Sequence, residues 1–365
     1  MNFSKGRVSE DNAELLSDNI ERTIMLQPFV SRRQFIAASL TVCGVSLSNK
    51  LRADGLSERY QALKSDEFFS GPLQVETKIV NQKVFTEGPA VAPDGRVFFT
   101  NAAASKILIW NPTTKDLTTF RENSGEANGL LFDHSGHLLA CEGKSGRVTR
   151  TDLATGQLTV VADQFSGHPL GAPNDLTIDA KRRIYFTSRL PNTDPAQGNV
   201  NSVYRIDPDG KLSRILHSPD IHMPNGVELS PDDRTLYLIE SDGRENRNRC
   251  VFAYDLRSDG TVANARRIID FYPGRGGDGL CVDEEGNLYI AAGLHKPRGT
   301  HETLDTRPGI HVVSPQGTLL AYLATPTDTL TNCTFGSADR RTLFITCGDT
   351  LLSVRTKRPG PKPLR

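Results

Sequence analysis

The sequence lacks several features that would point to a class of function. Its 43 basic and 43 acidic residues cancel, so a formal net charge of zero gives no support to nucleic acid or an anionic membrane as a partner. It contains no His-Glu-x-x-His pair, no phosphate-binding glycine loop and no Gly-x-Ser-x-Gly elbow. Serine-hydrolase chemistry therefore has no visible nucleophile.

Cysteine is scarce as well. Beyond Cys43, which falls in the N-terminal region, five cysteines remain: Cys141, Cys250, Cys281, Cys333 and Cys347. An odd number argues against a complete disulfide framework. Cys333 and Cys347 flank the last predicted hairpin symmetrically. We expect them to be buried thiols, with a disulfide between them as the alternative.

Glycine and proline, in contrast, are plentiful. The 31 glycines and 21 prolines suit many tight turns and argue against a helical bundle. With 37% hydrophobic and 24% charged residues, the composition is that of an ordinary soluble globular protein.

Residues 1–53 are predicted to be an N-terminal extension that carries a twin-arginine-type export signal. Arg32 and Arg33 directly precede the mildly apolar run 37–48, with a cleavage point after Ala53. The run is too short for a permanent anchor, so we expect no stable membrane span in the mature chain. The twin-arginine export machinery would then deliver the protein to the periplasm or outside the cell. A chance Arg-Arg pair before a buried helix is the alternative.

The predicted signal has one unusual property. Such signals rarely carry so long a segment ahead of the arginines, and translation from Met25 instead of Met1 would give a leader of conventional length. Both starts stay open at this point.

Six copies of one repeat follow. Each copy begins with an amide or carboxylate residue, continues as a short apolar strand and has a turn residue eight positions after the first residue. Residues 223–233 contain the clearest copy. The six first residues are Glu87, Asn128, Asn174, Asn225, Asp278 and Asn332. The six turn residues are Gly95, Gly136, Arg182, Asp233, Gly286 and Arg340. A second and a third strand follow in each copy, and a fourth follows in all but the last, as in the blades of a propeller.

The repeats predict an all-β fold, a six-bladed β-propeller with four antiparallel strands per blade. The last copy ends after its third strand, so we expect strand 75–80 to complete that blade and close the ring, which removes a free sheet edge. The predicted organisation is a linker over 54–74, the propeller over 75–355 and a frayed basic, proline-rich tail over 356–365. An insertion at 294–308 is interpreted either as a binding loop or as a solvated loop.

The first strand of each blade lines the centre of a propeller, so the six first residues should converge at one mouth of the central channel. Carboxylate and amide oxygens without thiolate or imidazole suit calcium or magnesium better than zinc or copper. The alternative is that Asn-Gly and Asp-Gly merely begin strands by capping turns. Six oxygen-bearing side chains at one repeat phase, two of them carboxylates, favour a binding site.

Several of these stretches together resemble a known family. They read Thr-Glu-Gly-Pro from Thr86, Ala-Pro-Asn-Asp-Leu from Ala172, Pro-Asn-Gly from Pro224, Gly-Asp-Gly-Leu from Gly277 and Thr-Asn-Cys-Thr-Phe-Gly from Thr331. The chain resembles the SMP-30/gluconolactonase/LRE-like family of six-bladed propellers over residues 75–355. The resemblance implies a divalent metal, usually calcium, with magnesium or zinc as alternatives. The implied metal ligands are Glu87, Asn174, Asn225 and Asp278.

The resemblance also implies an activity, since most members hydrolyse sugar lactones. The metal would polarise the lactone carbonyl, while Asp278 takes a proton from the attacking water. Asp175 is the second candidate for the base, because a carboxylate that touches a dication is a weak base. The expected substrate-binding residues are Asn128, Asn174, His168 and Arg189.

The chain departs from the family pattern near the expected substrate pocket. Members commonly read Tyr-Phe-Thr-Asp where this chain has Ser188 and Arg189 after Tyr-Phe-Thr, and many carry an arginine where this chain has Gly171-Ala172-Pro173. These changes bear on the substrate more than on the metal. Three other functions stay open: a related esterase or phosphotriesterase, a non-catalytic ligand-binding propeller, and a quinone-dependent sugar dehydrogenase. The last should show Arg, Lys and His at the mouth, which the aligned positions lack.

Overall fold

The computed structural model describes residues 59–189 and 200–362. The predicted export signal and the start of the predicted linker lie outside the described residues. Within them, no helix is long and apolar enough to cross a bilayer. Strands dominate, and the short helices η1 (Ser65–Glu67) and η2 (Ala102–Ala104) are single turns.

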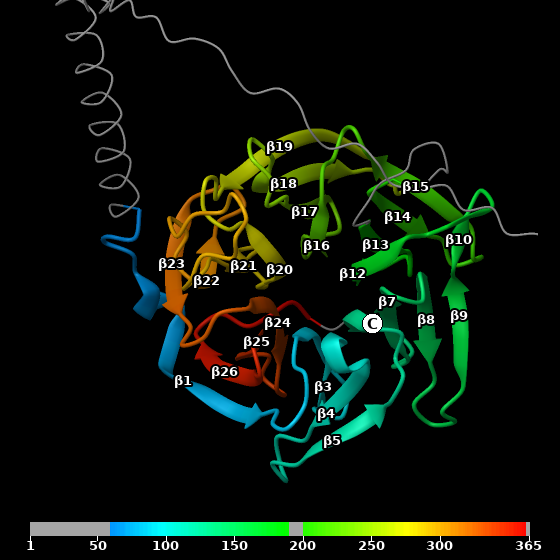
Figure 1. Ribbon diagram of the computed structural model, residues 1–365, viewed down its shortest axis with the longest axis horizontal. Coiled ribbons are helices and arrows are strands. Elements are labelled where there is room, and N and C mark those ends of the chain that lie inside the picture. Colours follow the sequence, from blue (N-terminus) through cyan, green and yellow to red (C-terminus); the bar gives the residue numbers. More distant parts are fainter. Residues whose placement is uncertain (1–58, 190–199, 363–365) are drawn as a thin grey trace, which may run out of the picture. The chain divides into compact units, whose positions relative to one another are not determined.

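Six four-stranded antiparallel sheets stand in a ring about a common axis, which confirms the predicted propeller (Figure 1). Blade one contains β2 (Thr86–Val91), β3 (Val97–Asn101), β4 (Lys106–Trp110) and β5 (Leu117–Arg121). Blade two contains β6 (Ala127–Phe132), β7 (Leu138–Glu142), β8 (Arg147–Thr151) and β9 (Leu158–Ala162). Blade three contains β12 (Ala172–Ile178), β13 (Ile184–Arg189), β14 (Ser202–Ile206) and β15 (Leu212–His217).

The other three blades repeat this order. Blade four contains β16 (Pro224–Leu229), β17 (Thr235–Ser241), β18 (Arg249–Leu256) and β19 (Val262–Asp270). Blade five contains β20 (Gly277–Val282), β21 (Leu288–Ala292), β22 (Gly309–Val313) and β23 (Leu319–Ala324). Blade six contains β24 (Leu330–Gly336), β25 (Thr342–Cys347), β26 (Thr350–Thr356) and β1 (Phe69–Lys78). A small hairpin, β10 (Gln164–Phe165) and β11 (His168–Pro169), precedes blade three.

The N-terminal strand β1 closes the ring as predicted, pairing antiparallel with β26. It begins at Phe69, so the residues from Phe69 to Gln74, which the sequence assigned to a linker, belong to this strand. The reason is local burial: Phe68 and Phe69 join the apolar cluster between blades five and six. Because burial of these aromatic side chains is favourable, the strand begins before its predicted start.

Six apolar clusters fill the six seams between neighbouring blades, including the closing seam between blades six and one. The period of two in each strand explains this arrangement. On β3, Phe98 faces blade two, whereas Val97 and Phe99 face blade six. A blade thus buries both of its faces, and no blade has a core of its own.

The turn after each innermost strand repeats one backbone geometry. All six residues predicted at this position have positive φ: Gly95 (89°), Gly136 (77°), Arg182 (64°), Asp233 (55°), Gly286 (84°) and Arg340 (58°). Glycine adopts this left-handed region without strain, which explains its presence in three of the six copies.

The predicted frayed tail is corrected in part. Residues Pro359 and Gly360 are buried, and Gly360 accepts a hydrogen bond from the Arg340 guanidinium. The Pro359 carbonyl accepts another from the Glu284 amide. This part of the tail therefore packs under blades five and six instead of fraying.

The five described cysteines are free and buried, as expected. The suggested partnership of Cys333 with Cys347 is wrong, because Cys333 lies opposite Ile345 in the sheet register. The Cys333 Sγ instead lies 3.5 Å from the Sγ of Cys281 on the neighbouring blade.

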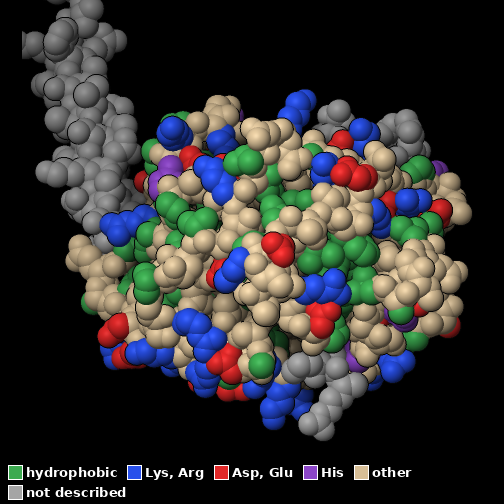
Figure 2. Space-filling model, turned by 90° about the horizontal axis from the view of Figure 1, so that it is seen from below, with side chains coloured by type: hydrophobic (Ala, Val, Ile, Leu, Met, Phe, Trp, Pro, Cys, Tyr) green, Lys and Arg blue, Asp and Glu red, His purple; other side chains and the backbone are tan. Residues whose placement is uncertain are grey.

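Acidic and basic side chains are interspersed on the side of the molecule shown in Figure 2. Among the described residues, many acidic and basic side chains form close pairs, such as Arg96 with Asp94 and Arg355 with Asp339. This mixed surface agrees with the zero net charge.

Candidate active site

The six first residues of the repeat lie at irregularities in their strands. In blades two to five the pairing of the first two strands slips across the first residue of the repeat, whereas it slips just after Glu87 in blade one and just before Asn332 in blade six. A bulge redirects the side chains that it contains. The regular alternation of the sheet is therefore interrupted at or beside each of these residues.

Glycine follows the first residue in four blades, and close approach of the next blade explains it. A Cβ on Gly88 would lie 2.1 Å from the Asn128 carbonyl oxygen, and one on Gly226 would lie 2.8 Å from that of Asp278. Each glycine thus lets the innermost strands of adjacent blades touch. In blade three this position is Asp175, so a carboxylate stands where four blades have glycine and blade six has Cys333.

Threonines on the second strands fix the backbone of the site residues. Thr100 Oγ1 donates to the Asn128 carbonyl at 3.0 Å, and Thr187 Oγ1 donates to the Asn225 carbonyl at 2.7 Å. Both bonds run from one blade to the next, so the position of each site residue depends on its neighbour.

The Asp278 carboxylate has a side-chain partner on each of its two oxygens. Its Oδ1 accepts a 2.6 Å hydrogen bond from Asn225 Nδ2, and its Oδ2 forms a close ion pair with Arg275. Asn225 Nδ2 also donates to Ser241 Oγ at 2.9 Å. With its side-chain nitrogen engaged in this way, Asn225 can offer its side-chain oxygen Oδ1 to a cation.

Glu87 is 2% exposed, yet no described residue donates a hydrogen bond to its carboxylate. Burial, and then the neighbouring Asp278 carboxylate, raise the pKa of Glu87 well above its usual value, against the opposing pull of Arg189. A buried carboxylate without donors needs a proton or a cation.

Asp175 lies beside this pair on the third blade. Its Oδ2 accepts a 3.2 Å hydrogen bond from Asn332 Nδ2, and its Oδ1 accepts one of 3.0 Å from the Leu176 amide. Burial raises the pKa of Asp175 to about 7, with the Leu176 amide acting in the opposite direction.

A cavity of about 470 Å³ opens beside these residues, over blades one to three. It is lined by the ends of second strands and the beginnings of innermost strands, which share one edge of each antiparallel blade. The lining residues are Phe85, Ala102, Ala103, Glu126, Asn128, Gly143, Lys144, Ala172, Pro173, Asn174 and Arg189.

The structure brings most of the predicted residues to this region. Asn128, Asn174 and Arg189 line the cavity, while Asn225 and Asp278 contact each other. His168 does not join them, because it is exposed on the small β10–β11 hairpin and does not line the cavity.

Three polar residues of the site were missed by the sequence reasoning. Arg275 lies three positions before Asp278, and Glu126 and Lys144 pair with each other at 3.1 Å while lining the cavity. None of the three occupies a repeated position. The hairpin topology is a usable signal for Lys144, because a residue just beyond a second strand must lie near the start of the first.

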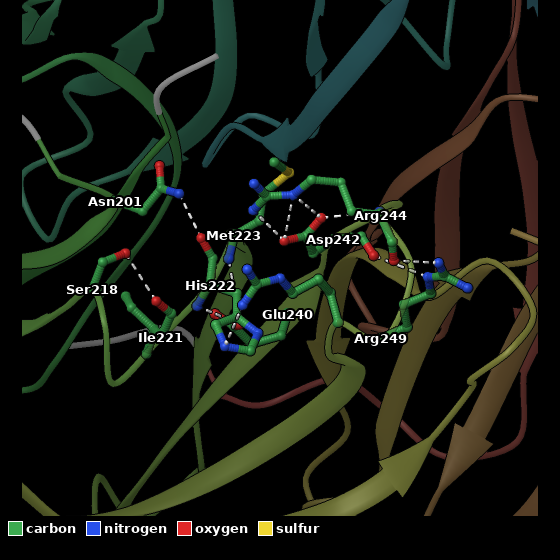
Figure 3. A network of polar contacts seen from close by, with 10 residues as sticks. Asn201, Ser218, Ile221, His222, Met223, Glu240, Asp242, Arg244 and Arg249 are labelled. Atoms are coloured by element: carbon green, nitrogen blue, oxygen red, sulfur yellow. Dashed lines mark hydrogen bonds and ion pairs between the residues drawn. The ribbon is translucent and has the colours of Figure 1, made fainter. Parts of the chain in front are cut away.

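A buried polar network holds the segment that leads to Asn225 (Figure 3). Glu240 is fully buried and accepts backbone hydrogen bonds from His222 at 2.7 Å and Met223 at 3.3 Å. Asn201, on the neighbouring blade, donates to the His222 carbonyl at 2.5 Å. The approach to Asn225 is thus anchored by blades three and four.

Arg249 lies beside Asp242 and Arg244 in this network (Figure 3) and extends it to the insertion at 294–308 through His301. Its guanidinium is fully buried and donates to four backbone carbonyls: Asp242 (2.9 Å), Arg244 (2.8 Å), Pro273 (2.7 Å) and His301 (3.1 Å). One side chain therefore joins blade four, the connection to blade five and the insertion.

The donor set fits a hard cation. Glu87 and Asp278 supply carboxylate oxygens, and Asn174 and Asn225 supply amide oxygens, which calcium and magnesium prefer. No three His, Cys, Asp or Glu side chains gather into a metal-binding group among residues 59–189 and 200–362. The proposed set does not require such a group, because only two of its four members are carboxylates.

Similarity to known proteins agrees with this arrangement. A gluconolactonase from Zymomonas mobilis is 29% identical over 319 residues, covering 80% of this chain and 83% of that protein. A solved gluconolactonase from Xanthomonas campestris is 28% identical with a TM-score of 0.67, covering 80% of this chain and 91% of that one. A calcium-binding protein, regucalcin, from Agrobacterium tumefaciens shares the fold at 19% identity and a TM-score of 0.63, covering 80% and 98%.

The family described as the SMP-30/gluconolactonase/LRE-like region matches residues 85–349, from the cavity residue Phe85 to the turn before β26. This span includes all six first residues of the repeat and every residue that lines the cavity. The chain belongs to the SMP-30/gluconolactonase/LRE-like family.

Proposed function

We propose that this protein hydrolyses a sugar lactone with the help of a divalent cation held by Glu87, Asn174, Asn225 and Asp278. The observation that carries the proposal is the donor-free, buried Glu87 carboxylate beside Asp278, next to a cavity large enough for a monosaccharide. Similarity to gluconolactonases from two bacteria supports the substrate class.

A cation bound by these four residues supplies a Lewis acid for the lactone carbonyl. The other roles belong to the chain itself. Arg275 and Asn225 hold the Asp278 carboxylate in one orientation, and Asn128 and Asn174 offer amide groups to the hydroxyls of a sugar in the cavity. These fixed groups orient the ring before reaction, which lowers the entropic part of the barrier.

Two carboxylates are candidates for the base that activates water. Asp278 acts more strongly than Asp175 on the Glu87 carboxylate and is held in place by Arg275 and Asn225, and a base must first be within reach of its proton. Burial raises the pKa of Asp175 to about 7, which suits a general base, but its carboxylate accepts hydrogen bonds from Asn332 and Leu176. We therefore propose Asp278 as the base and keep Asp175 as the alternative.

The central test is a metal-depletion assay. Purified protein is treated with chelator and assayed on gluconolactone, with calcium, magnesium or zinc restored separately. We expect hydrolysis only with metal, and a loss of at least about a hundredfold in Glu87→Gln. A folded protein that opens no sugar lactone under any of these conditions would exclude lactonase activity.

Asp278→Asn and Asp175→Asn distinguish the two bases. Calcium binding by calorimetry is measured beside turnover, because Asp278 is also a proposed ligand. If Asp175→Asn alone abolishes turnover while calcium still binds, Asp175 is the base and our assignment of Asp278 is incorrect.

We also propose that the protein is exported through its twin-arginine signal. The supporting pattern is Arg32-Arg33 ahead of the apolar run 37–48, in a region outside the described residues. Replacing both arginines by lysine should leave the protein in the cytoplasmic fraction, whereas unchanged export would contradict a twin-arginine route.

A further inference from the structure

Arg189 is a basic residue of the cavity lining. It ends β13, lies opposite Ala172 in the sheet and lines the cavity with a half-buried side chain. No carboxylate of the described residues forms an ion pair with it. The other buried arginines of blade three are paired: Arg183 binds Asp179 at 2.6 Å, and Arg205 binds Asp207 at 2.8 Å.

The remaining charges of the cavity cancel. Glu126 and Lys144 lie 3.1 Å apart and neutralise each other at the rim. Asn128 and Asn174 are neutral. The lining therefore has a net charge of plus one, carried by Arg189.

Glu87 does not remove this charge. Arg189 acts on the Glu87 carboxylate electrostatically, but the two side chains form no ion pair. This inference rests on the proposed function: once a divalent cation is bound by Glu87 and Asp278, those carboxylates are compensated, and Arg189 is left to a ligand.

We propose that Arg189 forms an anion-accepting subsite, and that the natural substrate is a sugar lactone bearing a carboxylate or phosphate group. A guanidinium presents paired N–H donors that match both anions. The amides of Asn128 and Asn174 belong to the lining of the same cavity and bind hydroxyl groups of the ring. Recognition of the charge is then separate from the cation-binding residues, which face the carbonyl to be hydrolysed.

Three lactones test the substrate class: neutral gluconolactone, glucarolactone with a carboxylate, and phosphogluconolactone with a phosphate. We expect at least one charged lactone to exceed gluconolactone about tenfold or more in kcat/KM, because a charge-assisted contact typically contributes this much. The preferred charged lactone shows whether the subsite suits carboxylate or phosphate. Arg189→Gln should erase the preference mainly through KM, lowering kcat/KM for the preferred charged lactone about tenfold more than for gluconolactone. Arg189→Lys should retain part of it.

The matched control is Arg234→Gln, which removes an exposed arginine far from the cavity lining and should leave the preference unchanged. Added salt should weaken the preference in wild type and not in Arg189→Gln. Equal kcat/KM for charged and neutral lactones, or a preference that survives Arg189→Gln, would overturn the proposal.

A binding measurement keeps this test independent of lactonase activity. Glucarate, phosphogluconate and gluconate are titrated into calcium-loaded wild type and Arg189→Gln by calorimetry. All three acids share the carboxylate formed from the lactone carbonyl, so the comparison isolates the additional anionic group of the first two. We expect Arg189→Gln to weaken binding of glucarate or phosphogluconate about tenfold more than binding of gluconate. Binding that is indifferent to Arg189, or absent for both glucarate and phosphogluconate, rejects the subsite. Selective binding without any lactone hydrolysis would reject only the proposed function.

Discussion

At the scale of single residues, two glycines allow the cost of a steric clash to be distinguished from the cost of backbone strain. Gly88 and Gly95 both have positive φ, at 47° and 89°. A Cβ on Gly88 would meet the Asn128 carbonyl at 2.1 Å, whereas nothing lies within 4 Å of one on Gly95. Gly95→Ala should therefore cost about 1 kcal/mol of unfolding free energy from strain alone. Gly88→Ala should cost an additional 1–3 kcal/mol, approximately, from overpacking against the next blade.

Urea denaturation of the two glycine variants measures this difference through the midpoint at constant m-value. Equal losses would show that the contact between blades one and two is loose enough to yield.

For Glu87 we predict a substitution that raises the free energy of unfolding, in contrast to the glycine substitutions. Its pKa in the folded protein is above that in the unfolded chain, so the unfolded state loses its proton first as pH rises. The metal-free protein should therefore lose stability between the two pKa values. In chelator at about pH 8, Glu87→Gln should be more stable than wild type, by on the order of 1–3 kcal/mol, and the gain should vanish near about pH 4.

Saturating calcium should reverse this order, because only the wild-type carboxylate binds the ion and ligand binding stabilises the folded state. Thermal unfolding with chelator and with calcium measures both effects. A variant less stable than wild type in chelator at both pH values would contradict the account.

At the scale of elements, Arg249 decides how firmly the insertion at 294–308 is held. Its buried guanidinium bonds four carbonyls, including that of His301. Arg249→Met leaves these carbonyls without their donors, and we expect a loss of about 3 kcal/mol or more. Hydrogen exchange across 294–308 should accelerate as well. Arg234→Met, whose side chain is 85% exposed, is the control and should change stability by less than about 0.5 kcal/mol.

If exchange in the insertion is unchanged in Arg249→Met, the insertion is held by its own contacts. One such contact is the hydrogen bond from His295 Nε2 to the Thr325 carbonyl at 2.9 Å, and removing His295 would then be the stronger perturbation.

At the scale of the whole molecule, repetition determines what the sequence can predict. Residues at the same position in each copy of the repeat can be aligned with one another. The blades, the positive-φ turns and the convergence of Glu87 with Asp278 follow from that alignment. Residues that occur once have no such support. Arg275 is one of them, and its ion pair with Asp278 depends on the path of an irregular connection between blades.

Contacts between blades are likewise hidden from the repeat. Cys333 and Cys347 belong to one hairpin in the sequence, but burial at the seam places Cys333 against Cys281 of the next blade. Phe69 lies in a stretch of mostly polar sequence. It is buried only because the seam between blades five and six provides an apolar cluster beside it. Sequence patterns within a blade predict its strands. Which residues contact each other between neighbouring blades is seen only in the assembled ring.

Closure of the ring is the property that belongs to the molecule as a whole. Strand β1 covers the outer edge of β26, and Phe69 and Ile79 fill the seams on either side of blade six. A chain that starts at Gly55 should therefore unfold in one cooperative transition. A chain that starts at Lys83 lacks β1, exposes an unpaired edge and should aggregate or lose cooperativity.

A synthetic peptide of residues 59–82 provides the control for this truncation, because an extended peptide can add to an open sheet edge. The peptide should restore solubility and calcium binding to the chain that starts at Lys83. The reason is that Glu87, in blade one, meets Asp278, in blade five, across the axis only when blade six joins its neighbours on both sides. A shortened chain with the same melting temperature and calcium affinity as the longer one would show that five complete blades and an open sixth suffice to hold the site.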